Sequence, residues 1–471
     1  MRHALSRVAL GSALLLVVAT PAGSAWKRYP IGAVALQGSS VAVDGTGRPH
    51  IVYWLSTDGG LRHAWRDGGR WRIETIDTLS SGSYGGAIVA DSNDRLHVAY
   101  SAARPGGYDL KYAVRDDQGW TLATVGPGGL SNSIGLDAQE RPHVSHVGNG
   151  GELLHSSFDG AAWTTETIAT GVTWFGGTSI AIAHSGIVHI AFSVRSATDT
   201  IYWANNSSGG WEVSALADGL YGSLRLDGAD HPRIAYLDAT GPNLVYAVHD
   251  GAAWSSQEVD VSSRDAGTIL DRVALALDAH DRPHIAYSGT VVRGEASLEL
   301  MAFALLDATG WRYSIVDRRN SGFDTAIALD QSGFPWITYR RGLPREKASL
   351  RAAHLALPDL RGAWSAATVT ADGQGFSIRA DLGVTNAGTT VSRGFSVACY
   401  LSTDDLYDAG DTPLGKPVKT GALGAGRSRT LRLAEKVGAS PSGRHVIAVI
   451  DAAGVVDEID EGNNAAATLV P

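Results

Sequence analysis

Hydrophobic and polar residues alternate along most of this chain, in short runs separated by turns rich in Gly, Asp and Pro. The first stretch of this kind contains four such runs, at residues 40–44, 49–56, 61–66 and 71–77. Alternation with a period of two is typical of β-strands, and short Gly-rich breaks are typical of tight turns. We therefore expect four antiparallel strands in this stretch.

One phrase recurs seven times, as a turn followed by a strand that opens with Pro-His or a variant of it. The first copy reads Asp44-Gly-Thr-Gly-Arg-Pro-His-Ile-Val-Tyr53, and equivalents of His50 stand at positions 97, 143, 189, 233, 284 and 336, which are 44 to 52 residues apart. A Trp that opens a strand recurs at Trp26, Trp71, Trp120, Trp163, Trp211, Trp254 and Trp311. A period of this length with four short strands per unit is typical of a β-propeller.

The two repeated anchors are out of phase, and this predicts how the ends of the repeat region meet. Trp26 precedes the first full unit, whereas the last unit, which begins near residue 325, has no Trp strand of its own. We expect residues 26–31 to form its outer strand, because that pairing removes an open sheet edge. The predicted fold class is all-β, with a seven-bladed β-propeller closed by the N-terminal strand at residues 26–357.

The repeat stops after Leu357, and residues 358–471 predict a small β-sandwich. The segments Val384-Thr-Asn-Ala-Gly388, Tyr400-Leu-Ser-Thr-Asp404 and Glu458-Ile-Asp-Glu-Gly-Asn-Asn464 make this tail resemble the CARDB domain, a bacterial cell-adhesion-related module. The resemblance implies an immunoglobulin-like fold and an accessory role in exported proteins. It implies no catalysis.

The turns before the Trp strands carry a second resemblance. Asp159-Gly-Ala-Ala-Trp163 and Asp250-Gly-Ala-Ala-Trp254 look like degenerate Asp-boxes of sialidase-type and related propellers, although they lack the full Ser/Thr-x-Asp-x-Gly-x-Thr-Trp form. Such boxes are structural in those proteins. The resemblance therefore supports the fold and says little about activity.

The N-terminus has the pattern of an export signal. Arg2 and Arg7 precede an apolar run at residues 8–19, and Gly23-Ser-Ala25 supplies small residues for cleavage. We predict a signal peptide at residues 1–25, a secreted or periplasmic mature protein, and no membrane span after cleavage. The expected mature protein is a monomer.

Charge and cysteine content narrow the function classes. The net charge of −9 argues against nucleic acid and anionic membranes, both of which favour basic patches. Cys399, the single cysteine, excludes an intramolecular disulfide, and its strand-like setting predicts a buried core residue and not a nucleophile.

Repeated polar residues are expected to have structural roles. The Asp that begins six of the seven turns is predicted to accept backbone N–H groups within its own turn. The fourth unit has His184 there, so we expect a turn of different shape. The recurring histidines, one per unit, are expected to contact their own unit instead of converging on a metal.

Connections on one rim of the predicted propeller vary in length and content, and variable loops on a rigid scaffold are where binding usually occurs. Aromatic and polar residues near the starts of the inner strands form the candidate ligand site: Tyr84, Asn132, Trp174, Phe175, Tyr221, Asp271, Arg272, Phe323 and Asp324. Rings stacked on a sugar, with polar groups on its hydroxyls, would bind a glycan. The alternative is that these residues pack the junctions between blades.

We therefore predict an exported, non-catalytic recognition or adhesion protein whose rim binds a glycan or a protein surface. The alternative is a sialidase-like glycoside hydrolase, which needs paired carboxylates that the sequence alone does not bring together. No cofactor is expected, and no catalytic residue is assigned. Acidic loops of the tail, at residues 404–411 and 457–461, carry the oxygen ligands that Ca²⁺ prefers but lack EF-hand spacing, and solvated turn carboxylates are the alternative.

Overall fold

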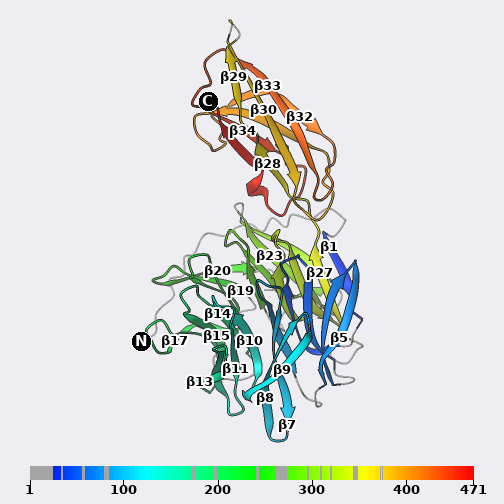
Figure 1. Cartoon of the computed structure of the whole chain (residues 1–471), viewed down its shortest axis with the longest axis vertical. Helices are drawn as coiled ribbons and strands as arrows, with labels where there is room; N and C mark the ends of the chain where they lie inside the picture. The colour runs from blue at the N-terminus through cyan, green and yellow to red at the C-terminus, as the bar shows by residue number, and fades with distance from the viewer. Residues whose placement is uncertain are drawn as a thin grey trace. The chain divides into compact units, whose positions relative to one another are not determined.

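A computed structural model provides the structure of this chain, and it describes residues 25–471 with short gaps. The gaps are residues 33–34, 56–58, 79–83, 172–175, 195–198, 240–242, 261–272, 294–295, 308–309, 319–320, 343–347, 372 and 374. The predicted signal peptide thus lies outside the described residues, except for Ala25. The described chain is built of β-strands and one short 3₁₀ turn, η2 (Glu461–Asn463), so the all-β prediction is confirmed (Figure 1).

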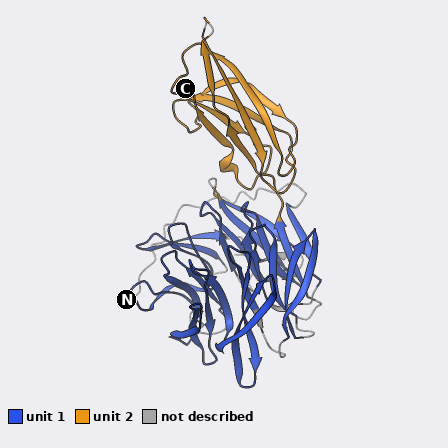
Figure 2. Ribbon diagram, viewed as in Figure 1, with its two compact units in different colours: residues 1–306, 311–354 blue, residues 307–310, 355–471 orange. Residues whose placement is uncertain are grey.

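The chain divides into two compact units, coloured separately in Figure 2. The first comprises residues 1–306 and 311–354, and the second comprises residues 307–310 and 355–471.

The N-terminal unit consists of antiparallel sets of four neighbouring strands. Set 1 contains β2 (Ala35–Val43), β3 (Pro49–Leu55), β4 (Gly60–Asp67) and β5 (Arg70–Thr78). Set 2 contains β6 (Tyr84–Ala90), β7 (Leu96–Arg104), β8 (Gly107–Asp116) and β9 (Gly119–Pro127). Set 3 contains β10 (Leu130–Leu136), β11 (Pro142–Val147), β12 (Glu152–Phe158) and β13 (Trp163–Thr170).

Sets 4 and 5 share the long strand β17 (Glu212–Leu226), which pairs with β16 through Asp218 and with β18 from Gly219 onward. Set 4 also contains β14 (Thr178–Ile182), β15 (Val188–Val194) and β16 (Thr200–Asn205), and set 5 contains β18 (Pro232–Asp238), β19 (Leu244–His249) and β20 (Trp254–Asp260). Set 6 contains β21 (Val273–Leu277), β22 (Pro283–Arg293), β23 (Ala296–Asp307) and β24 (Gly310–Asp317). Set 7 contains β25 (Ser321–Leu329), β26 (Pro335–Arg341), β27 (Ser349–Leu355) and β1 (Trp26–Pro30).

The predicted pairing of the N-terminal strand is confirmed. β1 is the outer neighbour of β27 in set 7, and the Ile31 amide donates a hydrogen bond to the Leu350 carbonyl at 3.2 Å. The first strand of each set lies against the first strand of the next, and β25 lies against β2. Within the described residues, however, no sheet closes on itself.

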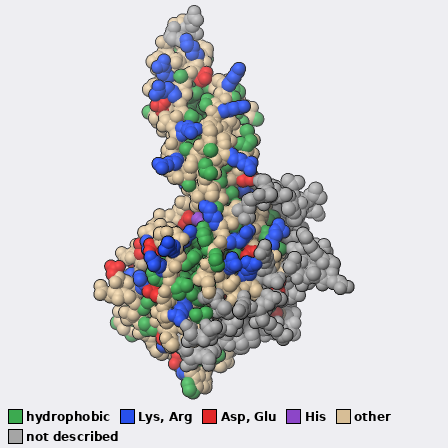
Figure 3. Space-filling view, turned by 90° about the vertical axis from the view of Figure 1, so that its right-hand side faces the viewer, with side chains coloured by type: hydrophobic (Ala, Val, Ile, Leu, Met, Phe, Trp, Pro, Cys, Tyr) green, Lys and Arg blue, Asp and Glu red, His purple; other side chains and the backbone are tan. Residues whose placement is uncertain are grey.

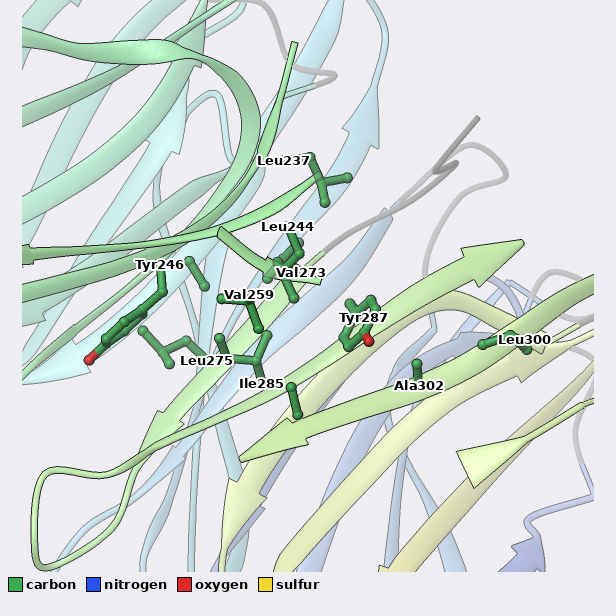
Figure 4. Close-up of a cluster of buried hydrophobic side chains, with 12 residues drawn as sticks. Leu237, Leu244, Tyr246, Val259, Val273, Leu275, Ile285, Tyr287, Leu300 and Ala302 are labelled. Atoms are coloured by element: carbon green, nitrogen blue, oxygen red, sulfur yellow. The ribbon is translucent and has the colours of Figure 1, made fainter. Parts of the chain in front are cut away.

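Side chains fill the space between neighbouring sets. In β3, Ile51 and Tyr53 are buried on one face, as the recurring aliphatic–aromatic pair predicts. Figure 4 shows the equivalent core between sets 5 and 6, where Tyr246, Leu275 and Ile285 come together from three strands. The repeated phrase is therefore a packing unit that each set presents to the next.

Each recurring Trp packs edge-on against an aromatic ring of the preceding set. Ring centroids lie 5.2–6.3 Å apart and the planes cross at 61–87° in these pairs: Trp71–Trp336, Trp120–His63, Trp163–Tyr112, Trp211–His155, Trp254–Trp203, Trp311–Tyr246 and Trp26–Phe303. This T-shaped geometry is favourable for aromatic rings. Trp26 supplies the contact between sets 6 and 7, so the N-terminal strand completes a pattern that recurs between all neighbouring sets.

The C-terminal unit contains two four-stranded sheets around an apolar core. One comprises β28 (Leu360–Trp364), β29 (Thr368–Ala371), β30 (Phe376–Asn386) and β33 (Ser428–Val437), and the other comprises β31 (Phe395–Ser402), β32 (Thr412–Thr420), β34 (His445–Ile450) and β35 (Ala465–Leu469). Cys399 is half-buried against this core, and burial raises the pKa of its thiol to about 11. A thiol of this kind is a poor nucleophile.

Acidic residues of this unit bind their own backbone. Asp404 accepts the Leu406 amide and Asp408 accepts the Gly410 amide, as expected of turn carboxylates. Glu458 is buried, accepts the Leu360 amide and has its pKa raised to about 8 by burial. On the face of the C-terminal unit seen in Figure 3, basic side chains are spread over the surface and acidic ones lie among them.

The N-terminal unit should depend on Trp26, which is 4 % exposed and donates its indole N–H to Ser314 Oγ at 3.0 Å. Trp26→Ala removes both the ring contact with Phe303 and this hydrogen bond, so we expect a loss of about 3–5 kcal/mol in unfolding free energy. Chemical denaturation measures the loss, with the exposed Lys27→Ala as control. A loss below about 1 kcal/mol would contradict a role for β1 in joining the sets.

Candidate functional site

The first strands of all seven sets line one cavity of about 1040 Å³. Its wall is made of residues within 38–43, 86–90, 130–134, 176–180, 221–226, 273–277 and 324–329, together with Arg340 of β26. Most of these residues are small or apolar. The few polar and charged side chains are therefore the groups that give the cavity its chemistry.

Five of the seven sets share a backbone position with positive φ in or just before the first strand, two residues before a Ser or Ala of that strand. Its φ is 65° at Gly38, 49° at Ser131, 74° at Gly177, 59° at Tyr221 and 55° at Asp324. In β10, β17 and β25 this position lies within a β-bulge. Bulges bend a strand and redirect side chains.

This left-handed conformation is easy for glycine and unfavourable for a residue with a Cβ, above all a bulky one. Sets 1 and 4 have glycine there, whereas sets 3, 5 and 7 hold Ser131, Tyr221 and Asp324 in it. Strain of this kind is concentrated at functional sites, where the side chain is needed at that point. All three residues line the cavity.

Asp324 forms the charged part of this end of the cavity. Its carboxylate lies 3.2 Å from Nε of Arg340, which comes from the neighbouring strand β26. Its backbone carbonyl accepts a hydrogen bond from the Ser39 hydroxyl at 3.0 Å, across the boundary between sets 7 and 1. The ion pair and the hydrogen bond hold the position of Asp324 from both sides.

Asn132 adds an acceptor to the same wall. Its Nδ2 donates to the Gly129 carbonyl at 2.8 Å, and its buried Oδ1 has no hydrogen-bond partner among the described residues. A buried acceptor without a donor is unfavourable unless a ligand or water satisfies it. The Gly129 amide in turn donates to Nδ1 of His146 at 3.1 Å, so His146 supports the segment that carries Asn132.

Serine hydroxyls hold neighbouring first strands together along this wall. Each accepts the amide of a buried aliphatic residue in the next set, in the pairs Ser40–Ile88, Ser133–Ile180, Ser179–Leu224 and Ser223–Leu275. The equivalent residues of sets 2, 6 and 7 are Ala87, Ala274 and Ala326. These bonds give the cavity wall a fixed shape.

The structure places some of the predicted site residues together. Asn132, Tyr221 and Asp324 line the cavity. Tyr84 and Phe323 lie in β6 and β25 next to the bulges, but their side chains are outside the described part of the chain, as are Trp174, Phe175, Asp271 and Arg272 as whole residues. Sequence reasoning identified neither Arg225 as a lining residue nor the pairing of Arg340 with Asp324.

The other ends of the first strands lead into the repeated turns. Oδ1 of all six recurring Asp residues accepts the amides two and four residues ahead, as for Asp44 with Thr46 and Arg48 at 2.9 Å each. The predicted turn role is therefore confirmed. Nε2 of His50 lies 3.0 Å from the second oxygen of Asp44, so this ring contacts its own unit, as predicted.

One expectation about these turns is wrong. The fourth turn has the backbone hydrogen bonds of the others, with the Ala183 amide donating to Ile187 O at 2.8 Å and the Gly186 amide donating to Ala183 O at 2.9 Å. Ala183, not His184, occupies the position of the Asp. The turn keeps this shape without a carboxylate at that position, and Asn206 Oδ1 accepts the Val188 amide, one residue beyond the turn, at 2.8 Å. In the described part of the chain, no group of three or more His, Cys, Asp or Glu side chains has the arrangement of a metal site.

Comparison with known proteins identifies the C-terminal unit. Residues 357–468 match the CARDB family model, so this part of the chain is a CARDB domain with an immunoglobulin-like fold. A solved CARDB domain from Pyrococcus furiosus, in complex with di-metal ions, is 20 % identical, covers 24 % of this chain and 90 % of its own, and has a TM-score of 0.19. None of the curated proteins matches the sequence.

Solved structures similar to the larger part of the chain include lectins and carbohydrate-active enzymes. The SapL1 lectin in complex with α-methyl fucoside is 15 % identical, covering 62 % of this chain and 99 % of its own, with a TM-score of 0.43. A family PL25 ulvan lyase is 9 % identical over 69 % and 95 % of the two chains, with a TM-score of 0.48. The Hadza microbial sialidase Hz136 is 11 % identical over 64 % and 75 %, with a TM-score of 0.38.

The strain at the bulges can be measured by substitution. A Cβ on Gly177 would meet no atom within 4 Å, so Gly177→Ala tests backbone conformation alone. We expect it to lower the unfolding free energy by about 1 kcal/mol. Gly210→Ala is the matched control, because it also has open space but no positive φ, and it should be neutral or slightly stabilising. Equal effects of the two changes would refute the strain.

The support of Asn132 by His146 predicts a pH dependence. Burial lowers the pKa of His146 to about 4. Its Nδ1 accepts the Gly129 amide, which requires this nitrogen to be unprotonated. The unfolded chain binds the proton first, so stability rises with pH between about 4 and 6.5. His146→Gln should flatten the slope of unfolding free energy between pH 5 and 7. The exposed His280→Gln should leave it unchanged, and an unaltered slope in His146→Gln would refute the assignment.

Proposed function

We propose that this protein is an exported, non-catalytic carbohydrate-recognition protein whose cavity holds part of a glycan. The observation that carries the proposal is the backbone strain at Tyr221 and Asp324, since both residues occupy positions where other sets use glycine. Their side chains line the same cavity. A protein keeps such strain where the side chain has a task.

The chemistry of the wall suits a polyhydroxylated ligand. Sugar hydroxyls both donate and accept, and the wall offers the Asp324 carboxylate, the Arg340 guanidinium and the unsatisfied Asn132 oxygen. The Tyr221 ring supplies an apolar face with a polar end, as ligand sites for such molecules require. A concave site of this kind favours a glycan over the flat surface of a protein partner.

The number of carboxylates in the cavity wall favours glycan recognition over glycan hydrolysis. Asp324 is the one carboxylate among the described residues of the cavity wall, and Arg340 pairs with it. Glycosidases generally need two carboxyl groups roughly 5–10 Å apart. A sialidase-like hydrolase is the alternative, and the assay below distinguishes it.

The remaining parts of the chain fit an exported binding protein. We infer that residues 1–25 are removed as a signal peptide, that residues 26–357 form a seven-bladed propeller around the cavity, and that residues 358–471 act as an accessory or adhesion module. In the part of the chain that the structure describes, no helix is long and apolar enough to cross a membrane. We expect a secreted or periplasmic monomer that does not bind nucleic acid.

The proposal is tested by glycan-array screening of the full mature chain, followed by calorimetry with the best ligand. Asp324→Asn and Tyr221→Ala should each weaken binding at least tenfold, because each removes a group that faces the ligand. The exposed Asp117→Asn should bind like the parent. No glycan bound, or equal affinity for all variants, would refute the proposal.

Release of reducing ends from the same ligand distinguishes the alternative. Turnover that is lost in Asp324→Asn and kept in Asp117→Asn would establish a glycoside hydrolase and overturn a purely binding role. Binding without release of reducing ends supports recognition.

A further inference from the structure

Arg225 breaks a pattern that the other six sets keep. It directly follows the buried aliphatic residue of the first strand, where the other sets have small or apolar residues: Ala42, Val89, Gly135, Ala181, Ala276 and Ala328. Arg225 lines the cavity. Set 5 therefore carries a long cationic side chain at a position where the other six sets have a short apolar one.

Set 5 also replaces the recurring histidine by Arg233, which is the direct partner of Arg225 across β17 and β18. The nearby carboxylate of Asp227 is fully used, since one oxygen accepts the amides of Ala229 and His231 and the other pairs with Arg233. Two arginines thus share one face of the sheet, and the carboxylate beside them is paired with only one.

Within the described residues, the guanidinium of Arg225 donates one hydrogen bond, from Nη1 to the carbonyl of Leu224 at 2.7 Å, and no carboxylate lies within ion-pairing distance. A guanidinium carries five N–H donors in a planar fork that matches carboxylate, sulfate or phosphate. Burial lowers the pKa of Arg225, which reflects the loss of hydration around this cation. Arg225 is half-buried, and a poorly hydrated charge of this kind is unfavourable until an anion compensates it.

The charge of the cavity is opposite to that of the protein. Among the described lining residues the charged ones are Asp324, Arg340 and Arg225, so the wall carries one positive charge after the ion pair is counted. The whole chain has a net charge of −9. Electropositive lining in an acidic protein concentrates anions at the site and not over the surface.

We propose that the cavity binds an acidic glycan and that Arg225 holds its carboxylate or sulfate group. This inference rests on the proposed carbohydrate function and specifies its substrate class. Arg225 is four residues beyond Tyr221 along β17, which is at most roughly 13 Å at the rise of a regular strand. The strained Tyr221 and the anion site would therefore contact different parts of one elongated ligand.

The test compares three probes on the full mature chain: an oligosaccharide containing glucuronate, its neutral counterpart containing glucose, and inorganic sulfate. We expect calorimetry to show tighter binding of the acidic oligosaccharide than of the neutral one. Arg225→Gln should weaken the acidic ligand about ten- to hundredfold, as expected for loss of a charge-assisted hydrogen bond. It should leave the neutral ligand within about twofold.

Arg225→Lys keeps the charge without the fork and should give an intermediate affinity. The exposed Arg70→Gln is the matched control for removal of one positive charge, and it should bind like the parent. A sulfated oligosaccharide that competes better than the glucuronate one would assign the anion as sulfate. Competition by free sulfate, weakened in Arg225→Gln, would support the anion site itself.

The outcomes separate this inference from the function on which it rests. Equal binding of acidic and neutral ligands, unchanged in Arg225→Gln, would overturn the anion site and leave carbohydrate recognition standing. Binding of neither ligand would overturn both. If Arg225 were only structural, Arg225→Gln would lower the unfolding midpoint without changing the ratio of the two affinities, and that result would also overturn the proposal.

Discussion

Packing between neighbouring four-stranded sets is the constraint on which the N-terminal unit depends. Hydrogen bonds of the strand ladders act within each set, and apart from the shared strand β17 they do not join one set to the next. Side chains must therefore supply the cohesion between sets. The Trp rings at the outer strands and the serine hydroxyls at the inner strands do so at opposite edges of each set, one by apolar contact and the other by hydrogen bonding to a backbone amide.

The serine hydrogen bonds between inner strands explain why the cavity has a defined wall. The aliphatic residue that donates its amide to a serine of the preceding set is itself buried, as Leu224 and Leu275 are. The same residue thus anchors the strand in the core and fixes its distance from its neighbour. A ligand site built on such strands is pre-organised, and little conformational freedom is lost when a ligand binds.

Much of the strand arrangement could be predicted from the sequence. The alternation of hydrophobic and polar residues indicates the strands, and the repeated phrase indicates the four-stranded sets. The pairing of β1 with β27 followed from counting Trp26 against the other anchors. The turn role of Asp44 and its equivalents followed from the hydrogen-bonding habit of Asp. In the fourth turn the same reasoning failed, because the backbone hydrogen bonds that join Ala183 to Ile187 and Gly186 form without a carboxylate.

The site was less predictable, for a physical reason. Tyr221 and Asp324 could be placed near the starts of inner strands, but their positive φ depends on bulges that no single strand pattern reveals. The ion pair of Asp324 with Arg340 links two strands whose register is set by those bulges. A position-by-position alignment of the units would have found Arg225, since it is the one charged residue among small or apolar ones.

The backbone strain and the unpaired charge at the cavity have the same energetic effect. A left-handed Tyr or Asp raises the free energy of the folded state, and so does a poorly hydrated guanidinium without a carboxylate. Neither is required by the architecture, because other sets fill the same positions with Gly, Ala or Val. Both costs fall on the wall of one cavity, where bound ligand can offset them. Most of the repeats avoid this loss of stability. A loss that is concentrated at one cavity is typical of a binding site.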